Sequence, residues 1–558
     1  MEAKKLKSAV EELRRSVLDD GRINKLEAEL LLKFTESVEI TPELKEFQDV
    51  LKQCLEDGVV TESESVRLAS HLDWLAREVI PAEPDVGFWG KLFKLGTNRT
   101  TVKTEFVAGL TTFMTMAYIL AVNPNLLSMA GIPRGGVFVA TALAAIVGTL
   151  LMAFMSNYPF VLAPGMGLNA FLTFGVCFGM GYSWQFALLA VFVEGLIFLA
   201  LSLTPVRESI FNSIPFTIKK AVAAGIGLFI CFIAMQTAKI IVNNDATLVG
   251  MQSFKNFGSN MHAVTAVLAI IGTILTGVLL VLRVKGAILF GIFITWGLGM
   301  LAQVTGIYVP NPEIGCFSTY PSFTMGDIAG VFKEFGATFC AIFNAESWTH
   351  TVDKAVVGSG WGLVKSLDFF VVMFAFFFVD LFDTLGTLIG VSMKGGFLTK
   401  EGKLPRISGA LCADAIATSV GAVLGTSTTT TYVESASGVM AGGRTGLTGV
   451  AASFFFLLAL LFAPIFLAIP GFATAPALII VGFMMLSSAA EIDWRSPGEA
   501  VPAFLAIATM PFAYSISDGI MAGVISYTFI NLISGKAKRI HWFMYILTAL
   551  FIAKYALM

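Results

Sequence analysis

Long apolar runs recur along this chain of 558 residues and set the strongest limit on how it can fold. Many reach the roughly 20 residues that a membrane-spanning helix needs. Charged residues make up 14% of the sequence, whereas an average soluble protein is about a quarter charged. The pattern predicts an all-α polytopic membrane protein and disfavours a soluble protein with deeply buried helices.

The apolar segments fall into two sets of seven, separated by a long polar stretch. Such a count indicates two repeats, an arrangement known in transporters. The first set covers residues 105–127, 136–156, 160–180, 183–204, 215–241, 262–283 and 286–304. The second covers 367–392, 405–425, 429–442, 446–469, 474–490, 498–534 and 540–557. We therefore expect about 14 transmembrane segments.

Charge divides the chain into an acidic head and a mildly basic body. Residues 1–86 hold 12 basic and 20 acidic residues, whereas the remainder holds 25 basic and 19 acidic residues. The first 30 residues are charged throughout, so we expect no cleavable signal peptide. We predict a cytoplasmic helical domain over 1–86, an interfacial linker over 87–103 and a transmembrane domain over 104–558.

The head contains an internal repeat at an offset of 37 residues. Val17–Phe34 and Cys54–Leu72 each predict a helix end, an Asp-Gly turn and a new amphipathic helix. Aligned as EF-hands, they place Ser16 and Gln53 where calcium would need carboxylates, so we do not expect calcium binding. The repeat resembles the helical tellurite-resistance (TerB-like) type of domain over these turns.

Basic residues between the segments predict the orientation, because Lys and Arg concentrate in cytoplasmic loops. With the N-terminus inside, the cluster at Lys536, Lys538 and Arg539 should also be inside. That requires residues 498–534 to form a hairpin bent at Ser515–Gly519, after which the last segment crosses outward or lies on the interface. We expect a multi-pass protein of the inner (cytoplasmic) membrane.

Two apolar segments are interrupted by residues that disfavour a continuous helix. Tyr158–Gly175 contains two prolines and several glycines in its middle, and Gly425–Gly438 is rich in Thr, which favours extended backbone. Each is the third segment of its half, and broken helices in corresponding positions indicate a binding site in the middle of the membrane. Such backbone must be buried in protein or line a cavity.

Several carboxylates lie inside these apolar segments. Asp380 and Asp383 share one helical face with two threonines, and Glu434 follows the Thr-rich run. A charge at the bilayer centre costs several kcal/mol and usually faces a pathway, although a polar bridge between helices is the alternative. Glu194 and Asp414 each stand alone in a segment and are equally consistent with helix pairing and with function.

Five blocks of the body resemble the nucleobase–cation symporter 2 family, in its adenine–guanine–hypoxanthine branch (the xanthine/uracil permease superfamily). They are Gly109–Pro124, Leu162–Phe171, Phe378–Gly390, Thr426–Val439 and Ala475–Leu486. The resemblance implies a 7+7 inverted repeat, with a core domain of segments 1–4 and 8–11 and a gate domain of segments 5–7 and 12–14. It also implies that segments 3 and 10 begin as short strands and continue as half-helices.

The same resemblance implies roles for individual residues. Asp380 and Glu434 are implied substrate contacts, and Asn169 and Asp383 are implied in binding or transport. Relatives of this fold often pair, so the resemblance also suggests a homodimer. Two features depart from the family: about 30 extra residues around Ala337–Lys365 and the acidic head.

The chemistry of a purine fits the residue types in the broken segments. Carboxylates can accept hydrogen bonds from its ring N–H groups, and N–H groups at a half-helix start can donate to its acceptors. Phe171, Phe378 or Tyr432 could stack on the ring. Gly167 and Thr431, from the two broken segments, complete the predicted substrate-binding set.

These residues predict import of hypoxanthine, guanine or adenine by proton symport with elevator-like alternating access. A carboxyl group in a low-dielectric surrounding favours its neutral form and can carry a proton. The hypothesis assigns the proton to Glu434 or Asp383 and the purine anchor to Asp380, with sodium as the alternative coupling ion. Two other interpretations are a uracil or xanthine transporter of the same fold and a nucleobase sensor that signals through the head.

The sequence gives no indication of an enzyme. The six cysteines and four histidines show no metal-ligand spacing, and no Ser-His-Asp or Cys-His arrangement is supported. We therefore expect no metal, no cofactor and no nucleic-acid partner; the predicted partners are the nucleobase, the proton and the lipid bilayer.

Overall fold

A computed structural model describes the chain from residue 23 to residue 557, with gaps. The gaps are residues 24, 37–41, 56–59, 61–63, 66–67, 69–70, 73–83, 205–214, 245–246, 256, 258–259, 312–315, 321–324, 353–354, 400–403 and 538–539. Within the described residues, 11 helices are long and apolar enough to cross a membrane. Neither segment that was predicted to be broken is among them.

The membrane part begins with the elements of the first seven predicted segments. They are α6 (Val102–Met116), α7 (Ile119–Leu127), η1 (Ser128–Ala130), α8 (Arg134–Ser156), β1 (Leu162–Pro164), α9 (Met166–Ala170), η2 (Phe171–Gly179), α10 (Trp184–Ser202), α12 (Phe216–Thr237), β2 (Ile241–Asn244), β3 (Leu248–Met251), α13 (Met261–Val281) and α14 (Ala287–Val304). The helix of segment 1 is interrupted between α6 and α7, and that of segment 3 is short and follows a strand.

The second set of segments has a matching series of elements. They are α17 (Leu367–Gly395), α18 (Ile407–Leu424), β6 (Thr429–Thr431), α19 (Ser435–Met440), α20 (Gly446–Ala459), η6 (Leu460–Phe462), α21 (Ala463–Ala468), α22 (Gly471–Leu486), η7 (Ser487–Glu491), α23 (Pro497–Phe512), α24 (Ile516–Ile533) and α25 (Trp542–Leu557). Segment 10 therefore has the same order of strand and short helix as segment 3.

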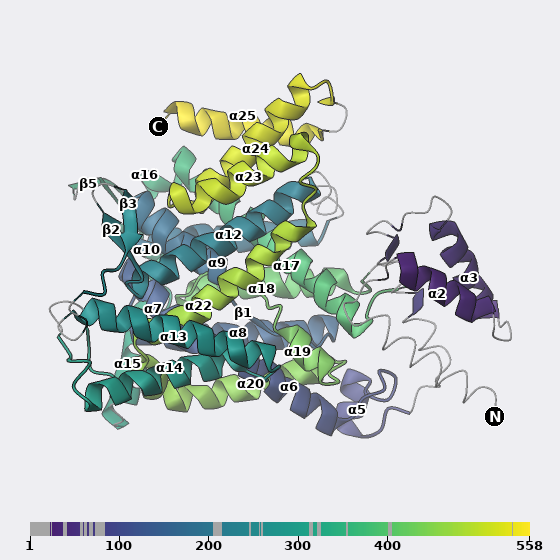
Figure 1. Ribbon diagram of the computed structural model, residues 1–558, viewed down its shortest axis with the longest axis horizontal. Coiled ribbons are helices and arrows are strands. Elements are labelled where there is room, and N and C mark those ends of the chain that lie inside the picture. The colour runs from purple at the N-terminus through teal and green to yellow at the C-terminus, as the bar shows by residue number, and fades with distance from the viewer. Residues whose placement is uncertain are drawn as a thin grey trace.

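The helices pack in two groups, each of which draws on both halves of the chain (Figure 1). In the first, which we name the core group, α8 and α10 pack on α18, and α6 and α8 pack on α20. In the second, the gate group, α12 packs on α22 and α23, and α13 packs on α14 and α22. The core group thus holds helices of segments 1, 2, 4, 9 and 11, and the gate group holds helices of segments 5, 6, 7, 12 and 13.

Strands β1 and β6 confirm the two predicted breaks and pair with each other. They run antiparallel, with Leu162 opposite Thr431 and Pro164 opposite Thr429. The pairing continues at both ends, because Gly165 N donates to Thr428 O (2.9 Å) and Tyr432 N donates to Val161 O (3.0 Å). All residues of both strands are buried, so each strand supplies the hydrogen bonds that the other cannot obtain from lipid.

The side chain of Glu105, on α6, forms hydrogen bonds with the N-terminus of α20. Its buried carboxylate accepts hydrogen bonds from the backbone N–H groups of Arg444 (2.8 Å) and Thr448 (3.1 Å), and from the Thr448 hydroxyl. A helix N-terminus leaves several N–H groups unpaired and carries partial positive charge, so a carboxylate is well suited to it. This contact joins segment 1 to segment 11 within the core group.

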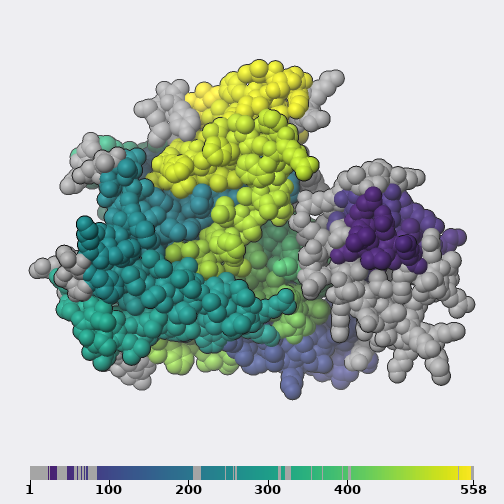
Figure 2. All heavy atoms as spheres, viewed as in Figure 1, coloured from purple at the N-terminus to yellow at the C-terminus, as the bar shows by residue number. Residues whose placement is uncertain are grey.

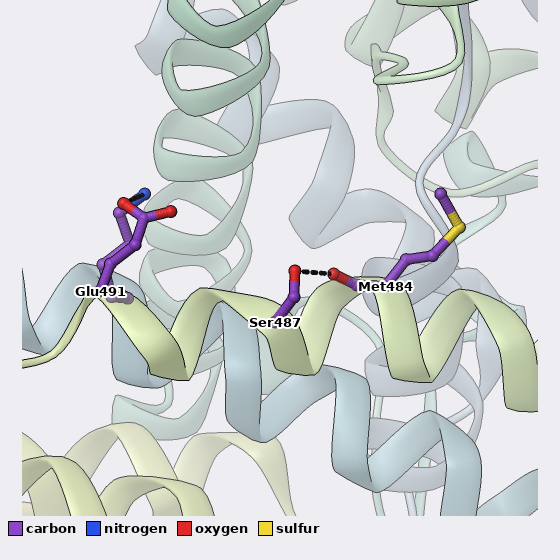
Figure 3. Close-up of polar contacts among 4 residues, drawn as sticks. Met484, Ser487 and Glu491 are labelled. Carbon is purple, nitrogen blue, oxygen red and sulfur yellow. Dashed lines mark hydrogen bonds and ion pairs between the residues drawn. The ribbon is translucent and has the colours of Figure 1, made fainter. Parts of the chain in front are cut away.

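An ion pair links α12 to the end of the α22–η7 helix in the gate group. Lys220 Nζ lies 2.7 Å from Glu491 Oε2. Figure 3 shows Glu491 and Ser487 on the same side of that helix end, where the Ser487 hydroxyl donates to the Met484 carbonyl at 2.6 Å. The pair is partly exposed, so it adds little energy to the apolar contact between the two helices.

The residues between segments 7 and 8, which include the extra residues around Ala337–Lys365, attach to the core group. They form α15 (Met325–Thr338), η4 (Ala341–Phe343), η5 (Ala345–Ser347), β4 (Thr349–Val352), β5 (Ala355–Ser359) and α16 (Trp361–Val364). Glu334 accepts from Gly135 N at the start of α8 (2.7 Å), and the Tyr182 hydroxyl donates to Asp368 (2.8 Å). Burial, followed by this hydrogen bond, raises the pKa of Tyr182, so its hydroxyl stays a donor at neutral pH.

Helices α23 and α24 form the predicted hairpin, but the bend comes slightly earlier than expected. It spans the residues between Phe512 and Ile516 rather than Ser515–Gly519. Tyr514 has a φ of 54°, and the Ser515 hydroxyl accepts from Asp518 N (3.2 Å) as the N-cap of α24. Capping therefore places the bend before the Ser-Asp-Gly sequence.

The N-terminal residues contain α2 (Lys25–Glu36) and α3 (Pro42–Cys54), which share a small apolar cluster of their own. Ile23, Leu31, Phe47 and Leu68 lie in that cluster, and Figure 2 shows the described head residues beside the helical body. The predicted Asp-Gly turns lie outside the described residues. The TerB-like resemblance therefore stays a prediction.

A short interfacial helix, α5 (Gly87–Phe93), follows the head and exposes Phe88, Trp89 and Leu92. Such an apolar face suits the membrane surface, as predicted for the linker. The Thr97 backbone N–H and hydroxyl donate to Asp85 (3.0 and 2.8 Å), and these bonds lower the pKa of that carboxyl.

We predict that Glu105→Gln lowers the free energy of unfolding by about 1–3 kcal/mol, because it removes hydrogen bonds between a carboxylate and buried N–H groups. Thermal unfolding of the purified protein in detergent measures the change as a drop in Tm of several degrees. The exposed Glu346→Gln variant is the control and should keep the Tm of the parent. An unchanged Tm for Glu105→Gln would show that the cap does not stabilise the core group.

Candidate functional site

Two half-helices begin at the paired strands. Helix α9 starts at Met166 directly after β1, and α19 starts at Ser435 shortly after β6. The Ser435 hydroxyl accepts from Val161 N (3.0 Å), and the Ser427 hydroxyl donates to the Asn169 side-chain carbonyl. These bonds tie each broken segment to the other, so the two helix N-termini are held at one place.

Glu434 lies at the junction of β6 and α19, as the residue before the first helical turn. The hydroxyl of Tyr118 donates to Glu434 Oε1 at 2.9 Å. Tyr118 is buried at the interruption between α6 and α7, whereas Glu434 is partly exposed. One carboxylate oxygen is thus held by the protein while the group keeps access to open space.

Asp383 on α17 lies near this junction, because α17 packs on α19. It is partly exposed, and the charge of Glu434 acts directly on it. Gly386 and Gly390 follow on the same helical face, and a methyl group added at either would meet no atom within 4 Å. Val433 beside Glu434 is 52% exposed. With Glu434 these residues form a partly exposed face along α17 from Asp383 to Gly390; we name it the α17 groove.

Asp380 has a different environment from Asp383, although both lie on α17. It is fully buried, and its carboxylate receives only long hydrogen bonds, from Thr384 (3.5 Å) and Thr418 (3.4 Å). Its other neighbours are the carboxyl groups of Glu194 and Asp414. In this conformation Asp380 does not border the α17 groove, and its role as purine anchor stays a prediction.

The remaining predicted polar residues make contacts inside the core group. Asn169 is fully buried and bonded to Ser427. Thr431 donates to Asp414 at 3.0 Å, and the Tyr432 hydroxyl donates to the Pro164 carbonyl at 2.5 Å. These contacts brace the paired strands, and the predicted role of each residue in binding is untested.

The predicted aromatic and glycine residues line the helices around the junction. Phe171 packs edge-on against Phe376, with ring centroids 4.8 Å apart. Phe378 is buried and packs near Phe374 at 5.0 Å. Gly167 faces Ile226 of α12, where a Cβ would collide with the side chain, so a glycine there allows core and gate groups to approach closely.

A cavity of about 250 Å³ lies between η2 of the core group and the α23–α24 bend of the gate group. Phe171, Phe178, Tyr514 and Asp518 are among the residues that line it. It lies at the opposite end of segment 3 from the paired strands. It therefore borders the contact between the two groups rather than the junction at Glu434.

Sequence reasoning missed one residue of this arrangement and left two undecided. Tyr118 was not singled out, although it lies within the block Gly109–Pro124. The sequence does contain an indication of its role: Tyr118 is an aromatic residue with a hydroxyl group inside an apolar run. Such a hydroxyl usually forms a hydrogen bond with a polar partner when it is buried. Glu194 and Asp414 were left open because each stands alone in its own segment, and only the packing of α10, α17 and α18 brings them together.

This architecture defines a multi-span membrane transporter: two broken helices meet at paired strands, and two partly exposed carboxylates lie beside them. The chain belongs to the xanthine/uracil permease family, because the family model described as "Permease family" matches residues 103–522. It is a permease and not an enzyme. Groups of three or more His, Cys, Asp or Glu suited to a metal ion are absent from the part of the chain that the structure describes.

Relatives of known sequence cover most of the chain. It is 44% identical to a putative permease of Methanocaldococcus jannaschii, over 84% of this chain and 98% of that protein. It is 42% identical to the guanine/hypoxanthine permease PbuG of Bacillus subtilis, over 81% and 96% respectively. It is 37% identical to the adenine permease AdeP of Escherichia coli, over 84% and 96%. The chain thus belongs among nucleobase permeases.

A solved structure shows a similar fold. The transmembrane domain of the cyanobacterial bicarbonate transporter BicA superposes with a TM-score of 0.50 at 14% identity, over 76% of this chain and 97% of that one. At this identity the likeness concerns the fold alone.

We predict that Gly386→Cys reacts with a membrane-impermeant thiol reagent at least tenfold faster than Gly277→Cys. Both positions have free space for a side chain, but Gly386 borders the α17 groove, whereas Gly277 lies on α13 among exposed apolar residues that face lipid. A thiol reacts as the thiolate, which forms only in water. The parent protein gives the background from its six cysteines. Equal rates would contradict a hydrated groove along α17.

Proposed function

We propose that this permease imports purine nucleobases across the cytoplasmic membrane by proton symport, with elevator-like alternating access. Its relatives PbuG and AdeP, named for guanine and hypoxanthine and for adenine, support the purine class. The separation of the helices into core and gate groups supports a movement of one group against the other.

The observation that carries the proposal is the packing of α17 on α19, which places the partly exposed Asp383 near Glu434 at the start of the α17 groove. A purine presents several N–H donors at its edge, and two carboxylates from different segments can accept them together. Tyr118 fixes one oxygen of Glu434, which leaves the other for the ligand. The backbone N–H groups at the start of α9 and α19 can donate hydrogen bonds to the acceptor atoms of the purine ring.

The other predicted contacts fit around this pair in the proposal. Asn169 and Thr431 form hydrogen bonds that keep the strands in register. Gly167 has no side chain, which allows helix α12 of the gate group to pack closely against it. Phe171 and Tyr432 supply aromatic surface near the half-helices. Asp380 reaches the substrate only if the core group rearranges.

We predict that Glu434→Gln and Asp383→Asn each lower uptake of hypoxanthine, guanine or adenine at sub-saturating concentration by about 10- to 100-fold. The loss corresponds to one hydrogen bond to a charged group, about 1.5–3 kcal/mol. Uptake of radiolabelled base by proteoliposomes, with and without an uncoupler, measures it, and a competition panel of unlabelled bases ranks the purines against uracil and xanthine.

The matched control is Asp493→Asn, which neutralises an exposed carboxylate outside the membrane helices and should leave uptake unchanged. Uncoupler-sensitive uptake at the parental rate in both Glu434→Gln and Asp383→Asn would overturn the site assignment. Uracil or xanthine outcompeting every purine would favour the alternative substrate class. Binding without accumulation would favour a sensor that signals through the head.

We predict that Tyr118→Phe raises the KM for the purine about fivefold with little change in the maximal rate. The variant loses the hydroxyl that holds Glu434 Oε1, a net contribution of about 1 kcal/mol because water can replace it at a partly exposed group. Initial uptake rates over a range of hypoxanthine concentrations separate KM from the maximal rate. Tyr432→Phe, whose hydroxyl donates to a backbone carbonyl instead, is the comparison variant. An unchanged KM for Tyr118→Phe would remove Tyr118 from the site.

Three further parts of the proposal concern the whole protein. Residues 1–86 form a cytoplasmic regulatory domain, residues 87–103 an interfacial linker, and residues 104–558 the permease, which spans the membrane about 14 times as an inverted repeat. The permease works as a homodimer. The exposed apolar face of α5 supports the linker assignment.

A further inference from the structure

The cavity between the core group and the gate group lies apart from Asp383 and Glu434. Its volume is about 250 Å³, and its walls come from η2 on one side and from the α23–α24 bend on the other. An apolar cavity of about 150 Å³ can hold a benzene ring, whereas pockets for drug-sized ligands begin at about 300 Å³. The space therefore suits a small molecule of one or two fused rings.

Aromatic rings contribute to both walls of the cavity. Phe171 and Phe178 line it from η2, and Tyr514 lines it from the bend. Rings of both groups hold Tyr514 in place, because its centroid lies 5.6 Å from that of Phe174 on η2 and 5.5 Å from that of Phe229 on α12. Flat aromatic ligands stack favourably on such rings. The walls thus favour an aromatic ligand over an aliphatic ligand of equal size.

Two polar side chains at the start of α24 line the same cavity. Ser517 is 5% exposed, and among the described residues none forms a hydrogen bond with its hydroxyl group. A buried hydroxyl without a partner costs free energy, which a ligand with an acceptor atom restores. Asp518 is partly exposed, and a carboxylate can accept several hydrogen bonds. Together they select a ligand that carries both an acceptor and an N–H donor.

The backbone is unusual on both sides of the cavity. From Phe171 to Gly179, η2 is a π-helix, and the Met180 N–H extends the pattern by donating to Gly175 O at 3.0 Å. Such helices are rare and are frequent at functional sites. On the other side, Tyr514 has a φ of 54°, which residues other than glycine adopt uncommonly. Unusual backbone of this kind clusters at binding sites.

We propose that this cavity is a second binding site for a purine nucleobase, and that its occupancy slows transport. A purine is a flat pair of fused rings, with N–H donors for Asp518 and acceptor atoms for Ser517. This inference rests on the proposed function, because it takes the transported purine as the ligand. It concerns a site separate from Asp383 and Glu434.

The effect on transport follows from the origin of the two walls. Helix η2 packs on α10 of the core group, and α24 packs on α23 of the gate group. A movement of one group against the other separates the walls. A purine that contacts both walls therefore stabilises the conformation in which they lie together and opposes the movement. At a concentration equal to the dissociation constant of this site, about half of the molecules in that conformation are occupied.

Equilibrium binding of labelled hypoxanthine to the purified protein in detergent tests for the second site. We expect a tight and a weak class of site, and Glu434→Gln should weaken only the tight class. Ser517→Ala should weaken only the weak class, by about two- to tenfold for one hydrogen bond of a neutral group. Asp518→Asn should weaken that class by about 10- to 100-fold, because the lost acceptor is charged.

Initial rates of hypoxanthine uptake by proteoliposomes test the effect on transport. In the parent, the rate should pass through a maximum and fall as the weak class fills. In Ser517→Ala the fall should move to a concentration about two- to tenfold higher, while the KM stays unchanged. The matched control is Ser526→Ala, which removes a hydroxyl of the same helix that donates to the Ala522 carbonyl and does not line the cavity. It should keep the parental curve.

A single class of site in the parent would overturn the inference, as would equal weakening of both classes by Ser517→Ala. A rate that reaches a plateau and does not fall, although the weak class fills, would overturn the effect on transport. If Ser517→Ala does not fold, Asp518→Asn decides by the same two measurements. Absence of hypoxanthine uptake in the parent would contradict the proposed function instead, whereas uptake with a single class of site contradicts the second site alone.

Discussion

The pairing of β1 with β6 is the contact on which the rest of the membrane part depends. Neither three-residue strand could exist alone in an apolar interior, because its backbone groups would have no partners. Paired, they satisfy each other and join segments 3 and 10. The half-helices α9 and α19 then start from one place, and every carboxylate considered for function lies around that place. The hydroxyl-rich sequence of β6 suits this role, since its side chains bond to neighbouring helices.

The strands also separate the buried acids into two sets with different surroundings. Asp383 and Glu434 border open space and can exchange hydrogen bonds with a ligand. Glu194, Asp380 and Asp414 are closed off behind them and depend on threonine hydroxyls and on one another. Helix α17 carries one member of each set, Asp383 and Asp380, one turn apart.

Sequence reasoning predicted the broken segments and the helical hairpin near residue 515, and it placed Glu434 at the junction after the Thr-rich strand. It treated Asp380 and Asp383 as one polar stripe, because residues three apart share a helix face. Helical periodicity gives the direction of a side chain but not what covers it, and α10 and α18 cover Asp380 while leaving Asp383 beside the groove. Tyr118 could not be assigned for a similar reason: its partner Glu434 lies 316 residues away in the chain.

The sequence by itself determined that this chain spans a membrane many times, where its helices break and which family it belongs to. Those properties follow from local composition, since apolar length, proline and β-branched residues act on the backbone nearby. Only the tertiary structure decided which acids lie near one another, which of them are partly exposed and which are fully buried. Burial and the supply of hydrogen-bond donors decide the charge of a carboxyl group, and both depend on helices that are distant in sequence.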